Sequence, residues 1–373
     1  MIRFIIRRFL EAIPVLILTS LLIYGILLIA PGGPEARFAQ NPHITTDQVN
    51  AFRHRWGLDQ PIPIQYCRWA GLCNPDHEGT VLGILPAPAT FLSNRGLPNF
   101  LPPVLGGGDN GILHGDFGFS ITDGRPVSAV ISERVVPTAI LAGSAWVLWV
   151  LIAFLTGMYA AVRRYSLFDS ALTIFTYVGL SLPVFWLGIM LITVFAGGLK
   201  ILPAGGMWTT RTVPPFGSAE YWTLFAANPI FVVTDLLRHL LLPLITLVVV
   251  SIAGDSRFVR SSMLDALNQD YVRTARAKGV PEWRVISKHA LRNALLPVIT
   301  NIGLEIPFLF TGAFITETVF SWPGMGRQFV DATNHYDYPV LMGILIIAAV
   351  ITIGANLLAD VLYAVVDPRI SYG

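Results

Sequence analysis

DYVRTARAKGVPEWRVISKHALRNALLP, residues Asp270 to Pro297, is a polar and basic stretch set between strongly apolar segments. Gly279 stands where the end of a helix needs a positive φ, and Pro281 suits the first turn of a new helix because its missing N–H would be unpaired there. The stretch therefore predicts two short helices with a sharp turn at 279–281. If the apolar segments span a membrane, this hairpin lies on one side of it and offers a docking surface.

The composition decides the class of the protein. Of the 373 residues, 54% are hydrophobic and 13% are charged, and the mean hydropathy is +0.62. Such a chain has too little polar surface to cover a soluble globule. About six segments are close to the roughly 20 apolar residues that a helix needs to cross a bilayer: 9–30, 137–162, 170–195, 237–254, 297–319 and 340–366. The predicted fold is an all-α integral membrane protein with about six transmembrane helices.

The distribution of Lys and Arg predicts the orientation of these helices. Basic residues cluster before the first span, after the second span and in the 255–296 loop: Arg3, Arg7, Arg8, Arg163, Arg164, Arg257, Arg260, Arg273, Arg276, Lys278, Arg284, Lys288 and Arg292. Because basic loops stay cytoplasmic, both termini and the 255–296 loop are expected inside. The 31–136, 196–236 and 320–339 segments are then outside.

The first apolar segment has an alternative interpretation as a cleaved signal peptide, since arginines, an apolar core and small residues follow one another there. However, the run from Phe9 to Ala30 has the length of a span. Residues 31–34, Pro-Gly-Gly-Pro, also offer no small-x-small cleavage site. We therefore expect a retained transmembrane helix.

The long outer segment has two parts that differ in amino-acid composition. Residues 43–73 carry apolar side chains at helical spacing and predict short helices, whereas residues 74–113 are rich in Pro and Gly and argue against long regular elements. Cys67 and Cys73, the two cysteines of the chain, lie in this segment. In an oxidising compartment a disulfide between them is a fair hypothesis, and two unrelated thiols remain the alternative.

Polar groups inside predicted spans mark a possible polar path through the bilayer. Asn301 and Glu305 are four residues apart on one helical face, and a charge at mid-bilayer costs about 2.5–3.5 kcal/mol on insertion scales. Glu305 should therefore face a cavity or be protonated, although an acid hydrogen-bonded between helices explains the pattern equally well. Ser181 precedes Pro183, which is expected to kink the third span.

The second arm of the hairpin predicts an amphipathic surface. A helical step of roughly 100° forms an apolar stripe and a basic stripe, respectively Trp283, Ile286, Ala290 and Asn293, and Arg284, Lys288 and Arg292. An exposed Trp and Ile beside a bend suit a knob that fits a cleft on a partner protein. A helix lying on anionic lipid with Trp283 at the interface is the alternative.

The hairpin resembles the cytoplasmic loop of permease subunits of binding-protein-dependent ABC importers, in the dipeptide/oligopeptide branch. That family has Glu-Ala-Ala, three residues and Gly, with Leu-Pro downstream. Ala275, Gly279 and the pair Leu296-Pro297 match, while Arg273 and Thr274 occupy the first two places of the pattern. DYVRTARAKG followed by HALRNALLP is the form expected in the peptide branch.

Further motifs resemble the same branch: ETVFSWPGMGR (Glu317 to Arg327), DYPV (Asp337 to Val340), GLDQP (Gly57 to Pro61), GDFG (Gly115 to Gly118) and the tail Asp367-Pro368-Arg369. The likeness covers most of the chain except about 74–113, which we interpret as an insertion. It implies four regions: an N-terminal transmembrane helix at 1–31, an external loop domain at 32–130, a type-1 permease domain at 131–366 with its coupling loop at 255–296, and a cytoplasmic tail at 367–373.

The resemblance implies that a coupling helix, about Val280 to His289, binds in a groove of a cytosolic ATPase. The residues expected to carry the coupling are Ala275, Gly279, Val280, Pro281, Trp283, Arg284 and Ile286. Asn301, Glu305 and Ser181 become candidates for the translocation path. The implied location is the plasma (inner) membrane of a bacterium or archaeon.

The chain itself has no motif for nucleotide hydrolysis or other catalysis. There is no G-x-x-x-x-G-K-[ST], no H-E-x-x-H and no G-x-S-x-G. We therefore predict no catalytic residues, no metal site and no cofactor in this chain, with ATP and Mg used by partner subunits.

The expected partners are a second permease, two cytosolic ATP-binding subunits, an external substrate-binding protein and membrane lipid, and no nucleic acid. Di- or oligopeptides are the expected substrates. Nickel chelates, glutathione or oligosaccharides are alternatives for the same machinery. A channel or secondary transporter that works without ATP is the alternative from a different class.

Overall fold

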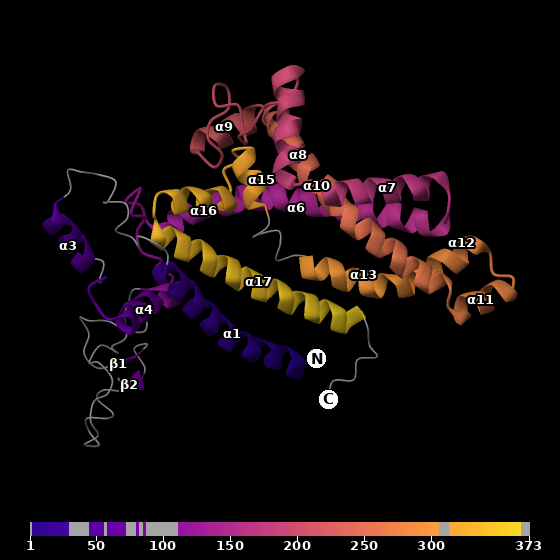
Figure 1. Cartoon of the computed structure of the whole chain (residues 1–373), viewed down its shortest axis with the longest axis horizontal. Coiled ribbons are helices and arrows are strands. Elements are labelled where there is room, and N and C mark those ends of the chain that lie inside the picture. Colours follow the sequence, from indigo (N-terminus) through magenta and orange to yellow (C-terminus); the bar gives the residue numbers. More distant parts are fainter. Residues whose placement is uncertain are drawn as a thin grey trace. The chain divides into compact units, whose positions relative to one another are not determined.

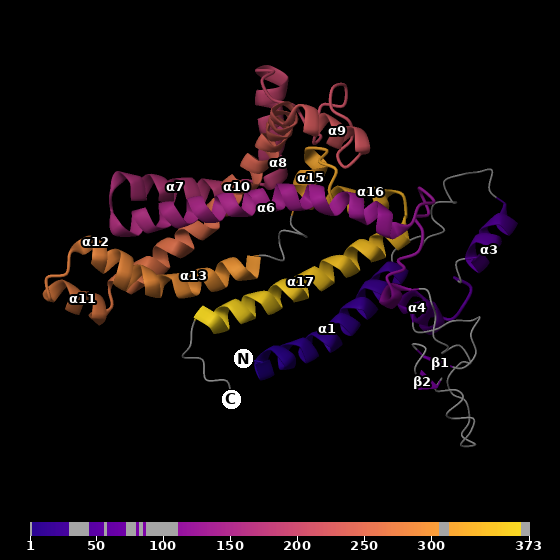
Figure 2. The same ribbon diagram turned by 180° about the vertical axis from the view of Figure 1, so that it is seen from behind.

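The computed structural model describes residues 2–29, 45–55, 58–71, 80–81, 85–86, 111–305 and 313–366. Most of them are helical, as two opposite views show (Figure 1, Figure 2). The chain divides into two compact units. The first comprises Met1–Pro14, Glu133–Gln328 and Ala348–Gly373, and the second comprises Val15–Ser132 and Phe329–Ile347.

Four of the described helices are long and apolar enough to cross a membrane. They are α1 (Ile2–Ile29), α6 (Val127–Val162), α10 (Pro229–Leu267) and α17 (Tyr338–Val366). They match the first, second, fourth and sixth segments that the sequence predicts. The prediction of a helical membrane protein is confirmed.

The third predicted segment is a bent pair of helices. α7 (Leu167–Ser181) is followed by α8 (Val184–Leu191) and the π-helix η2 (Ile192–Gly198), and the two halves meet at 100°. Pro183 stands at the start of α8 with φ −63° and cannot donate the bond that a continuous helix needs. The kink predicted at Pro183 is confirmed, and the described residues hold four candidate spans, or five if this pair forms one.

The fifth predicted segment, 297–319, is not tested as a single helix. α13 (Leu291–Glu305) and α15 (Phe314–Val319) cover its two ends, and residues 306–312 lie outside the described part of the chain. The total of about six spans therefore stays a prediction, as do the orientation and the domain boundaries.

Small residues let α6, α7 and α10 approach closely within the first unit. A Cβ added at Gly157 of α6 would lie 2.5 Å from the Ser256 carbonyl oxygen, and one at Gly179 of α7 would lie 3.0 Å from the Ala253 Cβ. Near these contacts lies an apolar core of Leu141, Ala142, Ala145, Trp149, Met207, Leu240, Leu247, Val248, Ile252, Ala313 and Trp322. These helices form the base from which the hairpin extends.

The remaining elements of the first unit are short. They are α9 (Ala219–Ala227), α11 (Asp270–Ala277), α12 (Glu282–Arg284) and the π-helix η3 (Val285–Ala290). The helix α16 (Met325–Asn334) begins in the first unit and ends in the second. α9 and α11 flank the two ends of α10, so the hairpin and α9 lie at opposite ends of that helix (Figure 1).

The second unit contains the short helices that residues 43–73 predict. They are α3 (Thr46–Arg55) and α4 (Ile62–Ala70), and the 3₁₀ turn η1 (Ile112–His114) follows later. Two-residue strands β1 (Thr80–Val81) and β2 (Leu85–Pro86) pair antiparallel, so the chain is not purely α-helical. The rest of the 74–113 segment, apart from residues 111–113, lies outside the described residues.

Two of the sequence motifs meet in the second unit. The buried carboxylate of Asp337, in the DYPV motif, accepts hydrogen bonds from the Ser120 hydroxyl and from the Ile121 and Thr122 N–H groups, the latter two both at 3.1 Å. These donors belong to the turn before α6. The motif therefore has a structural role, because it fixes this turn to the start of α17.

Candidate functional site

The turn of the hairpin is closed by backbone hydrogen bonds that require Gly279. Gly279 takes φ +73° just after α11. The Val280 N–H donates to the Ala275 carbonyl (3.2 Å), and the Gly279 N–H donates to the Arg276 carbonyl (2.9 Å). These two bonds form the Schellman motif, in which a left-handed residue satisfies the last carbonyls of a helix. The sharp turn predicted at 279–281 is confirmed.

The second arm is one continuous helical rod that leads into α13. Pro281 precedes α12, and its carbonyl accepts from the N–H groups of Arg284 (2.9 Å) and Val285 (3.1 Å). Pro281 is thus the N-cap, one position before the first turn that the sequence predicts. Val285 and Leu291, where α12, η3 and α13 join, keep a right-handed helical backbone. A displacement of the hairpin would therefore pass directly into α13.

The inner face of the hairpin packs on α6, α10 and α13. Val272, Val285 and Ala290 are completely buried. The cluster consists of Ala161, Met263, Ala266, Val272, Ala275, Val285, Ala290 and Ala294. Since well-packed side chains transmit strain, the hairpin is a rigid extension of these longer helices.

The outer face of the hairpin presents an aromatic ring and positive charge. Trp283 is 64% exposed, and the Arg284 guanidinium carbon lies 5.0 Å from the centre of its ring. Lys278, Arg273 and Lys288 are exposed as well. Trp and Arg are enriched among the residues that dominate protein interfaces, so this face is suited to a protein partner.

An ion pair ties the two arms across the turn. The Arg276 guanidinium donates to Glu282 with Nη2 at 2.7 Å from Oε1 and Nε at 3.1 Å from Oε2. Hydrogen bonding from Arg276 lowers the pKa of Glu282 and, conversely, raises the pKa of Arg276. Both side chains are about half exposed, so the contribution to stability is small.

The stripe predicted along the second arm is partly wrong. Trp283 and Asn293 are exposed, but Ile286 is half-buried and Ala290 is completely buried. The prediction assumed an α-helix throughout, whereas residues Val285–Ala290 form a π-helix with i→i+5 bonding, which rotates the side chains differently. Val285 takes the buried position in place of Ile286.

The predicted coupling residues therefore fall into two groups. Ala275 is buried, and Val280 and Ile286 pack against the same apolar cluster, so these three hold the hairpin together. Gly279, Pro281, Trp283 and Arg284 are exposed and available for contact.

The path candidates Asn301 and Glu305 meet a third polar residue that the sequence reasoning missed. The Asn301 Nδ2 lies 3.4 Å from Asp255 Oδ1 on α10 and 3.3 Å from Glu305 Oε1. Next to Asp255 and Asn301 lies a cavity of about 10 Å³, lined also by Val150, Ala153, Phe258, Val259, Val298 and Ile302. Asp255 was missed because the apolar run ends at 254, whereas α10 continues to Leu267.

Ser181, the other path candidate, lies on α7 and not in this cluster. It is exposed, and its hydroxyl donates to the Tyr177 carbonyl (2.8 Å) of its own helix. Of the predicted disulfide, Cys67 is buried near the end of α4 at 8% exposure. Cys73 lies outside the described residues, so the pairing stays a prediction.

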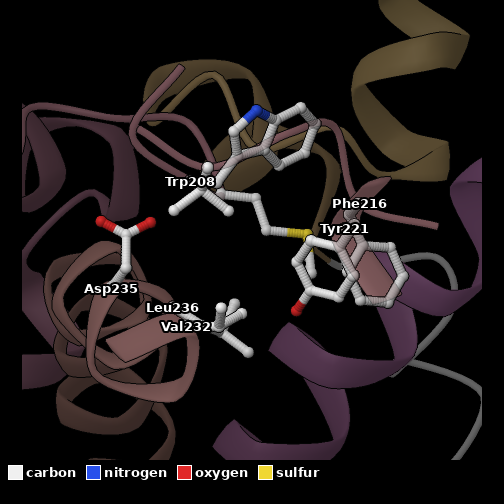
Figure 3. A pocket seen from close by; sticks show the side chains of 8 residues that line it. Trp208, Phe216, Tyr221, Val232, Asp235 and Leu236 are labelled. Carbon is white, nitrogen blue, oxygen red and sulfur yellow. The ribbon is translucent and has the colours of Figure 1, made fainter. Parts of the chain in front are cut away.

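An aromatic cluster covers the end of α10 that lies away from the hairpin. The rings of Trp208, Phe216 and Tyr221 face Val232, Asp235 and Leu236 of α10 (Figure 3). The Asp235 carboxylate accepts from the Thr209 N–H (2.9 Å) and hydroxyl (2.6 Å). Burial and, secondarily, Asp235 raise the pKa of Tyr221. The side chains fill this hollow, so it is a packed structural cluster and leaves no room for a ligand.

Comparison with known proteins identifies the family. Residues 153–372 match the family described as binding-protein-dependent transport system inner membrane component, and residues 1–94 match its N-terminal region. The chain belongs to this permease family. The hairpin is thus part of an inner membrane component of a binding-protein-dependent transport system.

Similar permeases extend over the whole chain. The oligopeptide transport system permease protein AppB of Bacillus subtilis is 38% identical over 370 residues, 99% of each chain. The dipeptide transport system permease protein DppB of Escherichia coli is 34% identical over 378 residues, 100% of this chain and 99% of the relative. The glutathione transport system permease protein GsiC of Salmonella paratyphi A is 32% identical over 372 residues, 100% of each chain.

Proposed function

We propose that this permease forms half of the translocation path of an ATP-driven importer for di- or oligopeptides. A second permease of the same type completes the path. Two cytosolic ATP-binding subunits supply the energy, and an external binding protein delivers the substrate. The peptide class rests on the names of the similar permeases, of which AppB and DppB cover almost the whole chain.

The observation that carries this proposal is the shape of the hairpin. Trp283 and Arg284 project from a turn whose inner face is buried against α6 and α10 and whose second arm runs into α13. A partner that binds the exposed face can therefore displace the membrane helices through the rigid hairpin when it moves. The chain has no phosphate-binding motif of its own, so the partner at this face would be the ATP-hydrolysing subunit.

Asp255, Asn301 and Glu305 are the proposed polar lining of the path. They come from α10 and α13, the two helices that join the hairpin. Closure of the ATP-binding subunits on nucleotide would then displace α13 and α10 together and alter access to these side chains. Ionisable groups at membrane depth usually line a cavity or a pathway, which favours this role for the cluster.

Replacement of Trp283 by Ala tests the coupling role. We expect the affinity for the ATP-hydrolysing subunits to fall about 30-fold, because a Trp at the centre of an interface contributes about 2 kcal/mol or more. Trp222→Ala is the matched control, since Trp222 is 52% exposed on α9, at the other end of α10. Co-purification and ATPase activity of the assembled complex measure the effect. Unchanged affinity in Trp283→Ala would contradict the proposal.

Glutathione is a second candidate substrate, favoured by the likeness to GsiC. Uptake of labelled dipeptide, oligopeptide and glutathione by cells that carry the complete transporter separates the two. Uptake that persists without the ATP-hydrolysing subunits would support the alternative of a channel or secondary transporter.

A further inference from the structure

The turn between α6 and α7 is too short to leave the membrane surface. α6 ends at Val162 and α7 begins at Leu167, and both belong to candidate membrane spans. The connection 163–166 reaches roughly 14 Å at most when extended. The headgroup layer of a bilayer is about 5–7 Å deep on each side. If α6 and α7 both end at the membrane surface, the side chains of this turn lie at the level of the headgroups.

Two exposed arginines give this turn positive charge. Arg163 and Arg164 are exposed, and neither forms an ion pair within the described residues. Asp169 is the single acidic residue between Glu133 and Glu220. Its carboxylate is taken by Arg260, with Oδ1 at 2.6 Å from Nε and Oδ2 at 2.8 Å from Nη2. Arg164 attracts this carboxylate through space without forming an ion pair. One carboxylate among Arg163, Arg164 and Arg260 leaves the turn with a net positive charge.

The geometry of the turn is fixed by the same carboxylate. Asp169 Oδ2 accepts from the Tyr165 N–H (2.9 Å), and the Ser166 hydroxyl accepts from the Asp169 N–H (3.2 Å). Tyr165 is held at φ +63°, a conformation that side chains other than Gly rarely adopt. Its ring is 78% exposed, with the Arg164 guanidinium carbon 4.4 Å from the ring centre. The arginines therefore extend from a rigid scaffold.

Apolar side chains surround this charge. Leu167 is 91% exposed, and Phe168 is 40% exposed with its ring 4.9 Å from that of Tyr159. Tyr rings are enriched at membrane interfaces, where basic side chains reach phosphates and Leu reaches acyl chains. A free phosphate or a nucleotide would satisfy the arginines and leave these apolar groups in water.

We propose that the α6–α7 turn binds the headgroup of an anionic phospholipid. Arg163 and Arg164 bind the phosphate, Tyr165 lies among the headgroups, and Leu167 and Phe168 contact the acyl chains. The turn lies at the hairpin end of α10, because Asp169 is bound to Arg260 near the C-terminal end of that helix. The basic loops of that end predict the cytoplasmic side, where anionic lipids attract basic segments.

A lipid titration tests this site. The full-length chain in detergent is titrated with phosphatidylglycerol and with phosphatidylcholine, and bound lipid is counted by native mass spectrometry. The double variant Arg163→Gln/Arg164→Gln should bind phosphatidylglycerol about 25-fold more weakly, about fivefold for each arginine. Phosphatidylcholine binding should not change. The control Lys200→Gln/Arg211→Gln removes the same charge from two exposed residues between α8 and α9 and should retain the affinity.

Three results would overturn the site. One is unchanged phosphatidylglycerol affinity in the arginine variant, and another is an equal loss in the control. The third is loss of binding to the ATP-hydrolysing subunits with lipid binding intact, which would assign the surface to a protein. If the glutamine variant does not insert, the salt dependence of lipid binding by the unaltered chain provides the test. Its preference for phosphatidylglycerol should fall with rising salt. A salt-independent preference would equally exclude the proposal.

Discussion

Two segments of this permease contain glycines that serve different purposes. In the hairpin, Gly279 has φ +73°, and a Cβ added there would meet no atom within 4 Å. In the 317–327 segment, an added Cβ would lie 2.4 Å from the Glu317 carboxylate at Gly324 and 2.3 Å from the Phe314 Cα at Gly326. The first glycine is needed for backbone conformation and the other two for space.

The 317–327 segment folds around one buried carboxylate, and the hydrogen bonds there form what is called below the Glu317 cluster. Glu317 is completely buried and accepts from the Thr138 hydroxyl (2.7 Å) and the Arg327 N–H (3.1 Å). Thr138 in turn accepts from the Met325 N–H (2.8 Å), and the Trp322 indole donates to the Pro137 carbonyl (2.9 Å). Every one of these bonds reaches across to α6 or closes the segment on itself.

The two segments therefore have different roles. The 317–327 segment fixes α15 to the beginning of α6 and is buried, so its motif is structural. The hairpin keeps its inner face buried but leaves Trp283, Arg284 and the turn exposed. One segment holds helices together, and the other leaves an exposed face for the partner proposed above.

The largest effect is expected from Gly326→Ala. The new methyl group would overlap the Phe314 backbone, which cannot shift without disturbing the hydrogen bonds of the Glu317 cluster. We expect a loss of about 1–3 kcal/mol or more in the free energy of unfolding. The control is Gly254→Ala on α10, where an added Cβ meets nothing within 4 Å. Thermal unfolding in detergent measures both variants, and equal midpoints would refute the packing role of Gly326.

The next effect is expected from Gly279→Val compared with Gly279→Asn. Valine at a left-handed position costs about 1–2 kcal/mol, so the turn should change its backbone conformation and the second arm its direction. Asn tolerates the left-handed conformation. The Val variant should insert normally but transport little substrate for each ATP hydrolysed, and the Asn variant should keep most of the transport. Uptake assays combined with ATPase rates measure this. Normal uptake by the Val variant would argue against a coupling role for the turn.

The smallest effect concerns the ion pair between Arg276 and Glu282. The pKa of Glu282 is lowered in the folded chain, so the stabilisation is present above the unfolded pKa and is lost as the pH falls through the folded value. The pair is half exposed and contributes a few tenths of a kcal/mol. Glu282→Gln should flatten the dependence of unfolding on pH below 4.5, the ordinary pKa of Glu. Arg276→Gln removes the other partner and should flatten the dependence in the same way, and a change in only one of the two variants would contradict the role of the pair.

The local chemistry of the hairpin could be predicted because it depends on neighbouring residues. Gly279 and Pro281 are separated by a single residue, and the backbone conformations that they impose need no tertiary contact. The bend at Pro183 follows for the same reason. The apolar runs were long enough to identify α1, α6, α10 and α17 by composition.

The side of the second arm that is buried could not be predicted in the same way. The sequence predicted an apolar stripe that includes Ile286 and Ala290, with Ile286 exposed. In the π-helix η3, Ile286 is half-buried, and Val285 and Ala290 are completely buried. Asp255 was missed since its partner Asn301 is far away in the sequence and α10 runs further than its apolar stretch. Likewise, the ETVFSWPGMGR motif gave no hint that Glu317 binds Thr138.

The sequence by itself determined the membrane class of this protein, the family it belongs to, and the turn at Gly279, because hydrophobicity and backbone restriction are local properties. The tertiary structure alone decided which of the predicted coupling residues are exposed, which acids meet at Asn301 and why the carboxylate of Asp169 pairs with Arg260 and not with Arg163 or Arg164. These depend on contacts between residues that are distant in the chain, such as Asp169 with Arg260 and Glu317 with Thr138. No periodicity or spacing encodes such pairs, since they form only when the helices pack.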